Sequence, residues 1–149
     1  MEVSAPQLIM RLYKYVKGIW SKIAFGMRSW FFDLRYKAVP REELNKWLQV
    51  WRTQILPALK YVADFFDCDD FAEYFAVWLK LKTGCNGVGI AIGILNTREG
   101  RGGHAWNVVV VDDGTKWSIE FIEPQTGMYV TPLVKPSKYT PYELKSVIM

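Results

Sequence analysis

The chain has 149 residues, of which 50% are hydrophobic, 15% are aromatic and 23% are charged, so one domain can bury a substantial core. This composition excludes a disordered or low-complexity chain. Two cysteines and one histidine are too few for a disulfide framework or a structural zinc site, and no apolar run approaches bilayer-spanning length. We therefore expect a cytoplasmic protein without a signal peptide or transmembrane segment.

The formal charge of +4 is unevenly distributed along the chain. Residues 1–60 carry 11 Lys and Arg against 4 Asp and Glu, whereas residues 61–149 carry 8 against 11, so the two parts are +7 and −3. A basic segment of this kind can contact nucleic acid or anionic lipid. The alternative is a solvated helix face, and a nucleic-acid partner is not expected.

The first predicted element is an amphipathic basic helix that begins at Ser4, with Pro6 in its first turn and Gln7 at the capping-box position. Gly18 and Gly26 weaken the prediction that it is unbroken. Residues 6–31 could lie on a membrane surface or bind a protein partner, but packing onto the same domain is the more ordinary outcome. The apolar stripe recurs every three or four residues and consists of Ile9, Leu12, Val16, Ile19, Ile23, Met27 and Trp30.

Two further helices are predicted before the strands. One begins at Pro40 with acidic residues in its first turn, and Pro57 should kink or restart it, leaving residues 58–66 as a separate turn. The other runs from about Asp67 to Lys82 and ends at Gly84.

After Gly87 the pattern changes to β-branched and aromatic runs that alternate with turn residues. Antiparallel strands are predicted over residues 87–95, 105–111 and 116–123, with a short edge strand over 128–134 and a proline-marked tail after it. The predicted fold class is therefore α+β, with N-terminal helices followed by a small antiparallel sheet on the Cys68 helix. We expect one domain over 1–149, with 1–60 as a helical, basic docking extension and 61–149 as the core.

Cys68 is the first candidate site residue. It shares a helical stripe with Phe71, Phe75 and Trp78, so its sulfur should point inward from the helix N-terminus. Free backbone N–H groups and the positive end of the helix dipole stabilise a thiolate at such a position. The alternative is a small buried hydrophobic residue.

The strands supply a histidine and a carboxylate. A two-residue turn at Asp113-Gly114 makes facing residue numbers sum to 227, which places His104 opposite Glu123. Glu120 should then lie on the opposite face beside Asn107, so Glu123 is the predicted partner of the imidazole. Cysteine, histidine and acid in this arrangement are typical of a cysteine-protease triad.

Three motifs, "CDDFA", "HAWN" and "FIEPQTG", resemble the papain-like C-terminal domain of fungal agglutinins, a calcium-dependent cysteine protease domain of the transglutaminase-like group. The resemblance covers about residues 61–130 and implies a papain-like fold. It also implies Cys68 as nucleophile, His104 as general base and acid, and Glu123 as the residue that orients the imidazole. The expected reaction is hydrolysis of a peptide or other amide bond in a protein substrate, with glutamine deamidation or acyl transfer as an alternative at the same site. The sugar-binding domain of the agglutinins is absent, so the resemblance implies no lectin activity.

The acidic neighbours of Cys68 predict a cation. Asp67, Asp69 and Asp70 should raise the pKa of the thiol, and a Ca²⁺ ion bound by these carboxylates would offset their charge. The resemblance implies calcium with Asp69 and Asp70 as ligands, and Gln125 is a further oxygen ligand in this hypothesis. Ordinary N-terminal helix capping would account for one or two of the aspartates without a metal.

Two other hypotheses remain open. One is that Cys85 is a rival nucleophile or a disulfide partner, although it does not lie at the start of a helix. The other is that the chain is a non-catalytic interaction protein that uses its basic N-terminal helix.

Asn107 and Asp67 are expected to shape the site of the leading hypothesis.

Overall fold

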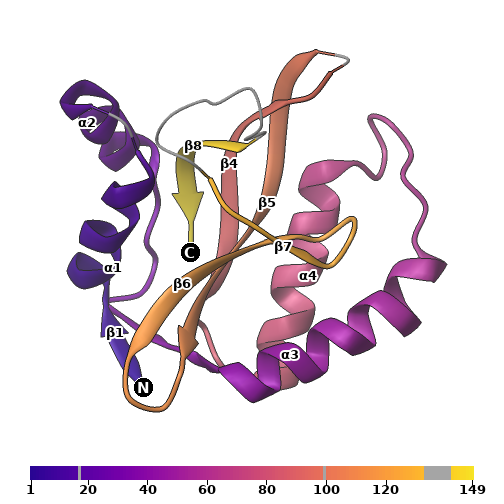
Figure 1. Cartoon of the computed structure of the whole chain (residues 1–149), viewed down its shortest axis with the longest axis horizontal. Helices are drawn as coiled ribbons and strands as arrows, with labels where there is room; N and C mark the ends of the chain where they lie inside the picture. Colours follow the sequence, from indigo (N-terminus) through magenta and orange to yellow (C-terminus); the bar gives the residue numbers. More distant parts are fainter. Residues whose placement is uncertain (17, 99, 133–141) are drawn as a thin grey trace.

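A central sheet lies between two groups of helices in the computed structural model, which describes residues 1–16, 18–98, 100–132 and 142–149 (Figure 1). The strand order is β7-β6-β5-β4-β8, with antiparallel neighbours, and a short strand pairs in parallel with β5. The predicted α+β class is confirmed. The bounds are β3 (Val39–Pro40), β4 (Val88–Asn96), β5 (Arg101–Asp112), β6 (Trp117–Glu123), β7 (Met128–Val130) and β8 (Tyr142–Ile148).

The predicted continuous N-terminal helix is wrong. The chain begins with β1 (Glu2–Ser4), which pairs with β2 (Arg35–Lys37), and continues through α1 (Ala5–Leu12), a 3₁₀ turn (Tyr13–Tyr15) and α2 (Ile19–Arg28). The break falls at Gly18, which precedes α2 with a φ of 74°, a left-handed conformation that glycine adopts without strain. The capping box is confirmed, because Gln7 Oε1 accepts hydrogen bonds from the N–H and hydroxyl of Ser4. Lys17 lies outside the described residues.

The apolar stripe of this segment is buried only in its first part. Leu12 and Val16 are buried, whereas the α2 residues Ile23 and Met27 are 46% and 81% exposed. The expectation that the whole stripe packs onto the same domain is therefore wrong, because the break at residue 18 turns α2 to a new direction. Among the described residues, no helix is long and apolar enough to cross a bilayer.

The second and third predicted helices are present. α3 (Arg41–Val50) follows Pro40 and continues as a π turn (Trp51–Ile55) and a 3₁₀ turn (Leu56–Ala58) that contains Pro57, so the helix changes its geometry next to this proline, as predicted. α4 (Cys68–Thr83) ends at Gly84, whose φ of 62° gives a left-handed C-cap.

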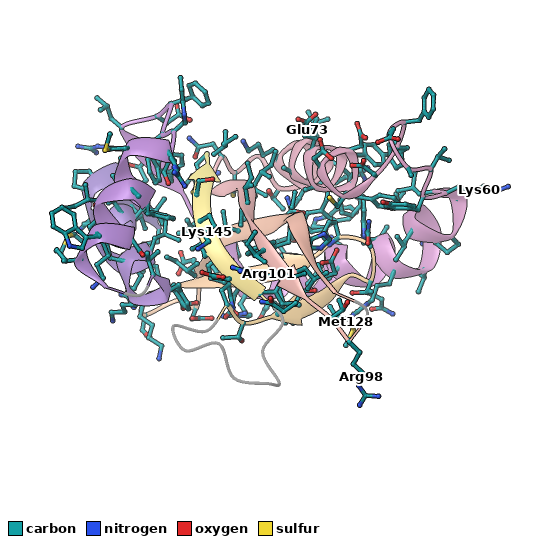
Figure 2. The ribbon with its side chains drawn as sticks, turned by 90° about the horizontal axis from the view of Figure 1, so that it is seen from above. Lys60, Glu73, Arg98, Arg101, Met128 and Lys145 are labelled. Carbon is teal, nitrogen blue, oxygen red and sulfur yellow. The ribbon has the colours of Figure 1, made fainter. Side chains whose placement is uncertain are left out.

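The core has two parts, one on each face of the sheet (Figure 2). Alternation along β5 directs Trp106, Val108 and Val110 to the α1 and α2 side, and Val109 and Val111 to the α3 and α4 side. β5 is therefore buried on both faces, and this packing fixes the positions of the residues at its two ends.

The predicted register of the β5–β6 hairpin is wrong by two residues. Asp112 faces Trp117 rather than Thr115, so facing numbers sum to 229 and the loop spans the four residues 113–116. Asp113 N–H donates to the Lys116 carbonyl across this loop. Because the shift is even, every side chain keeps its predicted face.

The predicted C-terminal tail contains a strand. β8 pairs with the free edge of β4, and the pairing shifts between Ile92 and Gly93. A side chain on Gly93 would collide with the Glu143 carbonyl, so glycine allows this close approach. The predicted edge strand over 128–134 ends at Val130, and its last two residues lie outside the described part of the chain.

Candidate functional site

Glu123 is a buried carboxylate at the end of β6 with three hydrogen-bond donors around it. It accepts from His104 Nε2 at 2.7 Å, from the Tyr142 hydroxyl at 3.0 Å and from the Gln125 N–H at 3.2 Å. The Glu123 residue is 5% exposed, so its charge depends on these donors for stabilisation. Burial and the nearby Glu123 carboxylate raise the pKa of Tyr142 well above its ordinary value, which keeps its hydroxyl protonated.

The predicted contact between His104 and Glu123 is present even though the register differs. In the observed register these two residues are diagonal rather than direct cross-strand neighbours, and diagonal side chains on one face remain within reach. Glu120 lies on the other face, as predicted, where it binds Arg41 at 2.7 Å. Because Nε2 contacts a carboxylate, we assign the imidazole proton to that nitrogen.

Cys68 is the first residue of α4 and is half-buried. Burial raises the pKa of its thiol, the nearby Ala105 N–H lowers it, and Asp67 and Asp69 raise it further. The net direction is upward, so the sulfur is a protonated thiol near neutral pH. Asp67 and Asp69 raise the pKa of the thiol, as predicted. Together with burial, they outweigh the stabilisation that the helix N-terminus gives to a thiolate.

Cys68 and His104 are attached to opposite faces of the sheet. The His104 ring lies 6.1 Å from the Trp106 ring, on the α1 side, whereas α4 packs against the other face. No hydrogen bond joins Cys68 to His104 in the described part of the chain. The structure thus pairs His104 with Glu123 and leaves the thiol beside the Ala105 backbone.

The three acidic neighbours of Cys68 have separate positions. Asp70 accepts a hydrogen bond from the Asp67 N–H at 3.1 Å, and Asp67 accepts one from the Asp69 N–H at 3.4 Å. These two aspartates form the capping box of α4. Asp69 is exposed and takes no part in the cap through its side chain.

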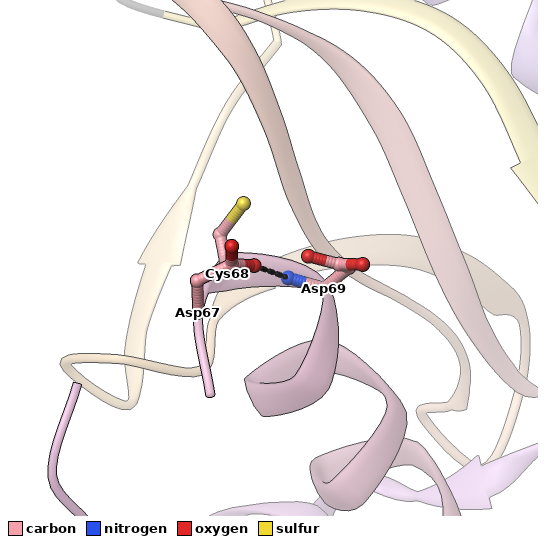
Figure 3. A group of neighbouring side chains, drawn as sticks. All are labelled: Asp67, Cys68 and Asp69. Carbon is pink, nitrogen blue, oxygen red and sulfur yellow. Dashed lines mark hydrogen bonds between the residues drawn. The ribbon is translucent and has the colours of Figure 1, made fainter. Parts of the chain in front are cut away.

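One carboxylate oxygen each from Asp67 and Asp69 and the Cys68 sulfur lie within 4.8 Å of one another (Figure 3). The Asp67 carboxylate raises the pKa of Asp69 through a side-chain hydrogen bond, while the same contact lowers the pKa of Asp67. Two carboxylates this close together can also hold a cation between them. The oxygen donors fit a hard cation such as Ca²⁺, whose remaining ligands would come from water or from hydroxyl groups of a bound molecule.

The remaining predicted site residues, Asn107, Gln125 and Cys85, have other contacts. Asn107 is fully buried and donates to the carbonyls of Ala72 and Gly89, so it ties α4 to the sheet. Gln125 follows β6 in the turn beside Glu123. Cys85 is 2% exposed and unpaired, with its sulfur near the Thr83 carbonyl, so it is not accessible as a nucleophile.

Tyr142 is the residue of the Glu123 group that the sequence analysis missed. It lies in the segment "YELKSVI", which the sequence analysis places in the proline-marked tail and the structure forms into β8. The alternation of apolar and charged residues from Tyr142 to Lys145 is the signal that could have identified this strand, although the alternation is lost at Ser146 and Val147.

The fold and the site together define a compact α+β domain with a buried carboxylate network and an acidic helix start. The sequence model of the agglutinin C-terminal family matches residues 36–129. The chain therefore belongs to the agglutinin C-terminal family. No curated protein sequence matches the chain.

Two solved structures resemble the chain in fold. One is titled "PSL1a-E64 complex", with a TM-score of 0.63, 22% sequence identity and 99% coverage of this chain. The other is Polyporus squamosus lectin bound to a human-type influenza-binding epitope, with a TM-score of 0.60, 22% identity and the same coverage. The chain spans 50% and 49% of those two chains, about half of their length.

These comparisons contradict the predicted cysteine hydrolase and its deamidase and acyl-transfer alternatives. They name an agglutinin family and a lectin, and neither names a papain-like peptidase. The raised pKa of the Cys68 thiol gives a physical reason in the same direction, because a protonated thiol is a weak nucleophile.

Proposed function

We propose that this chain is a non-catalytic binding module of the agglutinin type, and that it binds a glycan with the help of a divalent cation. Family membership supports the agglutinin class. Polyporus squamosus lectin, which shares the fold, is described with a bound glycan epitope. The observation that carries the proposed site is the convergence of the Asp67 and Asp69 carboxylates at the start of α4.

Glycan hydroxyl groups are suitable ligands for this site. Asp67 and Asp69 supply two of the six to eight oxygen ligands, roughly, that Ca²⁺ takes, so most of the coordination shell is open to other oxygens. Two neighbouring hydroxyl groups of a sugar ring can complete it. The sugar would then bind to the cation, and the protein would hold the cation.

Two exposed aromatic residues precede the acidic cluster in the chain. Phe65, which is 83% exposed, lies in the turn that the Val62–Phe66 hydrogen bonds close, and Tyr61, which is 58% exposed, comes directly before that turn. Rings exposed to this degree next to oxygen ligands can stack on the apolar face of a sugar. The cluster and these two rings are the proposed glycan site.

Calorimetric titration of the full chain with a panel of glycans, in CaCl₂ and in EDTA, tests this function. We expect binding in calcium that disappears in EDTA and in the double variant Asp67→Asn with Asp69→Asn. Glu73→Gln is the matched control, because Glu73 is an exposed carboxylate further along the same helix (Figure 2). Glycan binding that is identical in EDTA and in the double variant would refute the cation site. Turnover of a peptide library that is lost in Cys68→Ala would refute a purely binding role.

A further inference from the structure

A groove lies on the other face of the sheet, between α1 and the start of β6. Its volume is about 590 Å³. Trp117, at the groove, pairs with Asp112 at one end of β5, whereas Ala105, whose N–H lies near Cys68, is close to the other end. The groove is therefore separate from the Cys68 cluster. The groove is lined by Pro6, Gln7, Met10, Arg11, Lys14 and Trp117.

The groove contains two positively charged side chains for which the described part of the chain provides no ion-pair partner. Arg11 and Lys14 are one helical turn apart, and within the described residues neither forms an ion pair with a carboxylate. Three basic side chains elsewhere in the first 60 residues, Arg35, Arg41 and Lys46, do form ion pairs with carboxylates. The unpaired charges leave the groove positive and suited to an anion.

Trp117 holds Arg11 in a defined orientation. The guanidinium carbon lies 4.4 Å from the centre of the Trp117 ring, which is a cation–π contact. A guanidinium in a cation–π contact keeps N–H donors that can bind a carboxylate or sulfate in a bidentate manner. The Arg11 donors are therefore available to an anion beside the Trp117 ring.

The other lining groups are donors and apolar surface. Gln7 uses its carbonyl oxygen in the capping box, which leaves its NH₂ group for a ligand. Met10 is 66% exposed and Pro6 is exposed, so the groove also presents apolar atoms. A ligand that fits this set has anionic and hydroxyl oxygens together with an apolar ring face.

We infer that this groove binds an acidic saccharide, a sugar that carries a carboxylate or a sulfate. The inference rests on the proposed glycan-binding function for its choice of a sugar, but the anion preference comes from Arg11 and Lys14 alone. It also explains part of the basic charge of the N-terminal segment, which the core does not require.

The test is titration of the full chain with three hexasaccharides of similar size: hyaluronan hexasaccharide with carboxylates only, a heparin-derived hexasaccharide with carboxylates and sulfates, and neutral maltohexaose. The experiment is done in EDTA, so that the Asp67 and Asp69 cluster does not contribute. We expect the two acidic sugars to bind at least about tenfold more tightly than maltohexaose, with affinity that falls as salt rises. The ratio between the two acidic sugars shows whether sulfate adds to carboxylate.

Arg11→Gln with Lys14→Gln should lower the affinity for the acidic sugars about tenfold or more. Lys22→Gln with Arg28→Gln is the matched control, because it removes the same charge from α2 and should change the affinity less than about threefold. Trp117→Leu should weaken binding without changing the charge. Thermal unfolding of each variant shows that it is folded.

Equal losses in the two double variants would overturn the inference, because binding would then follow net charge rather than the groove. Tighter binding of a single-stranded oligothymidylate than of either acidic sugar would also overturn it, in favour of a nucleic-acid surface. If neutral glycans bind in calcium while acidic sugars show no preference in EDTA, only this inference fails. If no glycan binds under either condition, the proposed function fails with it.

Discussion

Replacing Glu123 tests whether the buried carboxylate network is a structural element of the domain. Glu123→Ala removes the acceptor shared by His104, the Tyr142 hydroxyl and the Gln125 N–H, and leaves two partly buried side-chain donors unpaired. Leaving a buried donor without an acceptor costs about 1–3 kcal/mol, so the loss of both side-chain hydrogen bonds should cost about 2–6 kcal/mol. Because 1 kcal/mol shifts the midpoint by roughly 2–4 °C in a domain of this size, we expect a decrease of roughly 10 °C in Tm. Glu123→Gln keeps the shape and one acceptor, so its cost should be smaller, about 1–3 kcal/mol.

Glu143→Ala is the matched control for this prediction. Glu143 forms ion pairs with Arg101 and Lys145, but its side chain is 32% exposed, against 7% for Glu123. Exposed ion pairs contribute about 0–1 kcal/mol, so this variant should lose little stability. Thermal and urea unfolding followed by circular dichroism measure both variants. A loss in Glu123→Ala no larger than in Glu143→Ala would refute the structural role, and loss of calcium-dependent glycan binding in folded Glu123→Gln would show that the network belongs to the binding site.

Three further variants test other parts of the structure. Gly93→Ala should destabilise the domain by about 3 kcal/mol or more in urea unfolding, because the added methyl group would collide with the backbone of β8; a neutral result would refute the pairing of β8 with β4. Trp51→Phe removes the 2.8 Å hydrogen bond from the indole to the Pro124 carbonyl and should cost about 1–3 kcal/mol, with a smaller loss if water replaces the donor. Calcium affinity, measured against pH, should begin to fall at a higher pH than it would for a site with an ordinary aspartate, because Asp67 raises the pKa of Asp69. Protons compete with the cation as the pH decreases through that pKa. A calcium affinity that stays constant to lower pH would exclude Asp69 as a ligand.

The elements with strong local signals could be predicted from the sequence. α4 was predicted to within a residue or two because an acidic N-cap and a left-handed glycine mark its two ends. The contact between His104 and Glu123 was also predicted, although the hairpin register was two residues off. It survived because an even shift preserves the face of each side chain, whereas a shift of one would have separated the two residues.

The failures have physical causes that a short window of sequence does not contain. The N-terminal helix breaks at Gly18, where a left-handed φ costs nothing, and β1 forms because β2 lies beside it. β8 forms because β4 has a free edge, and Gly93 admits its backbone there. These are long-range pairings, and only the tertiary arrangement determines which partner strand is available.

The acidic start of α4 shows how far the cation hypothesis depends on a single side chain. Helix capping accounts for Asp67 and Asp70, because each accepts a backbone N–H that the helix would otherwise leave unpaired. Asp69 is exposed, its side chain caps nothing, and its pKa is raised by its neighbour, so the fold gives no reason for a carboxylate there beyond the helix dipole. Asp69→Asn alone should therefore remove cation binding while leaving the stability of α4 nearly unchanged, whereas Asp70→Asn should weaken the cap and leave the cation site in place.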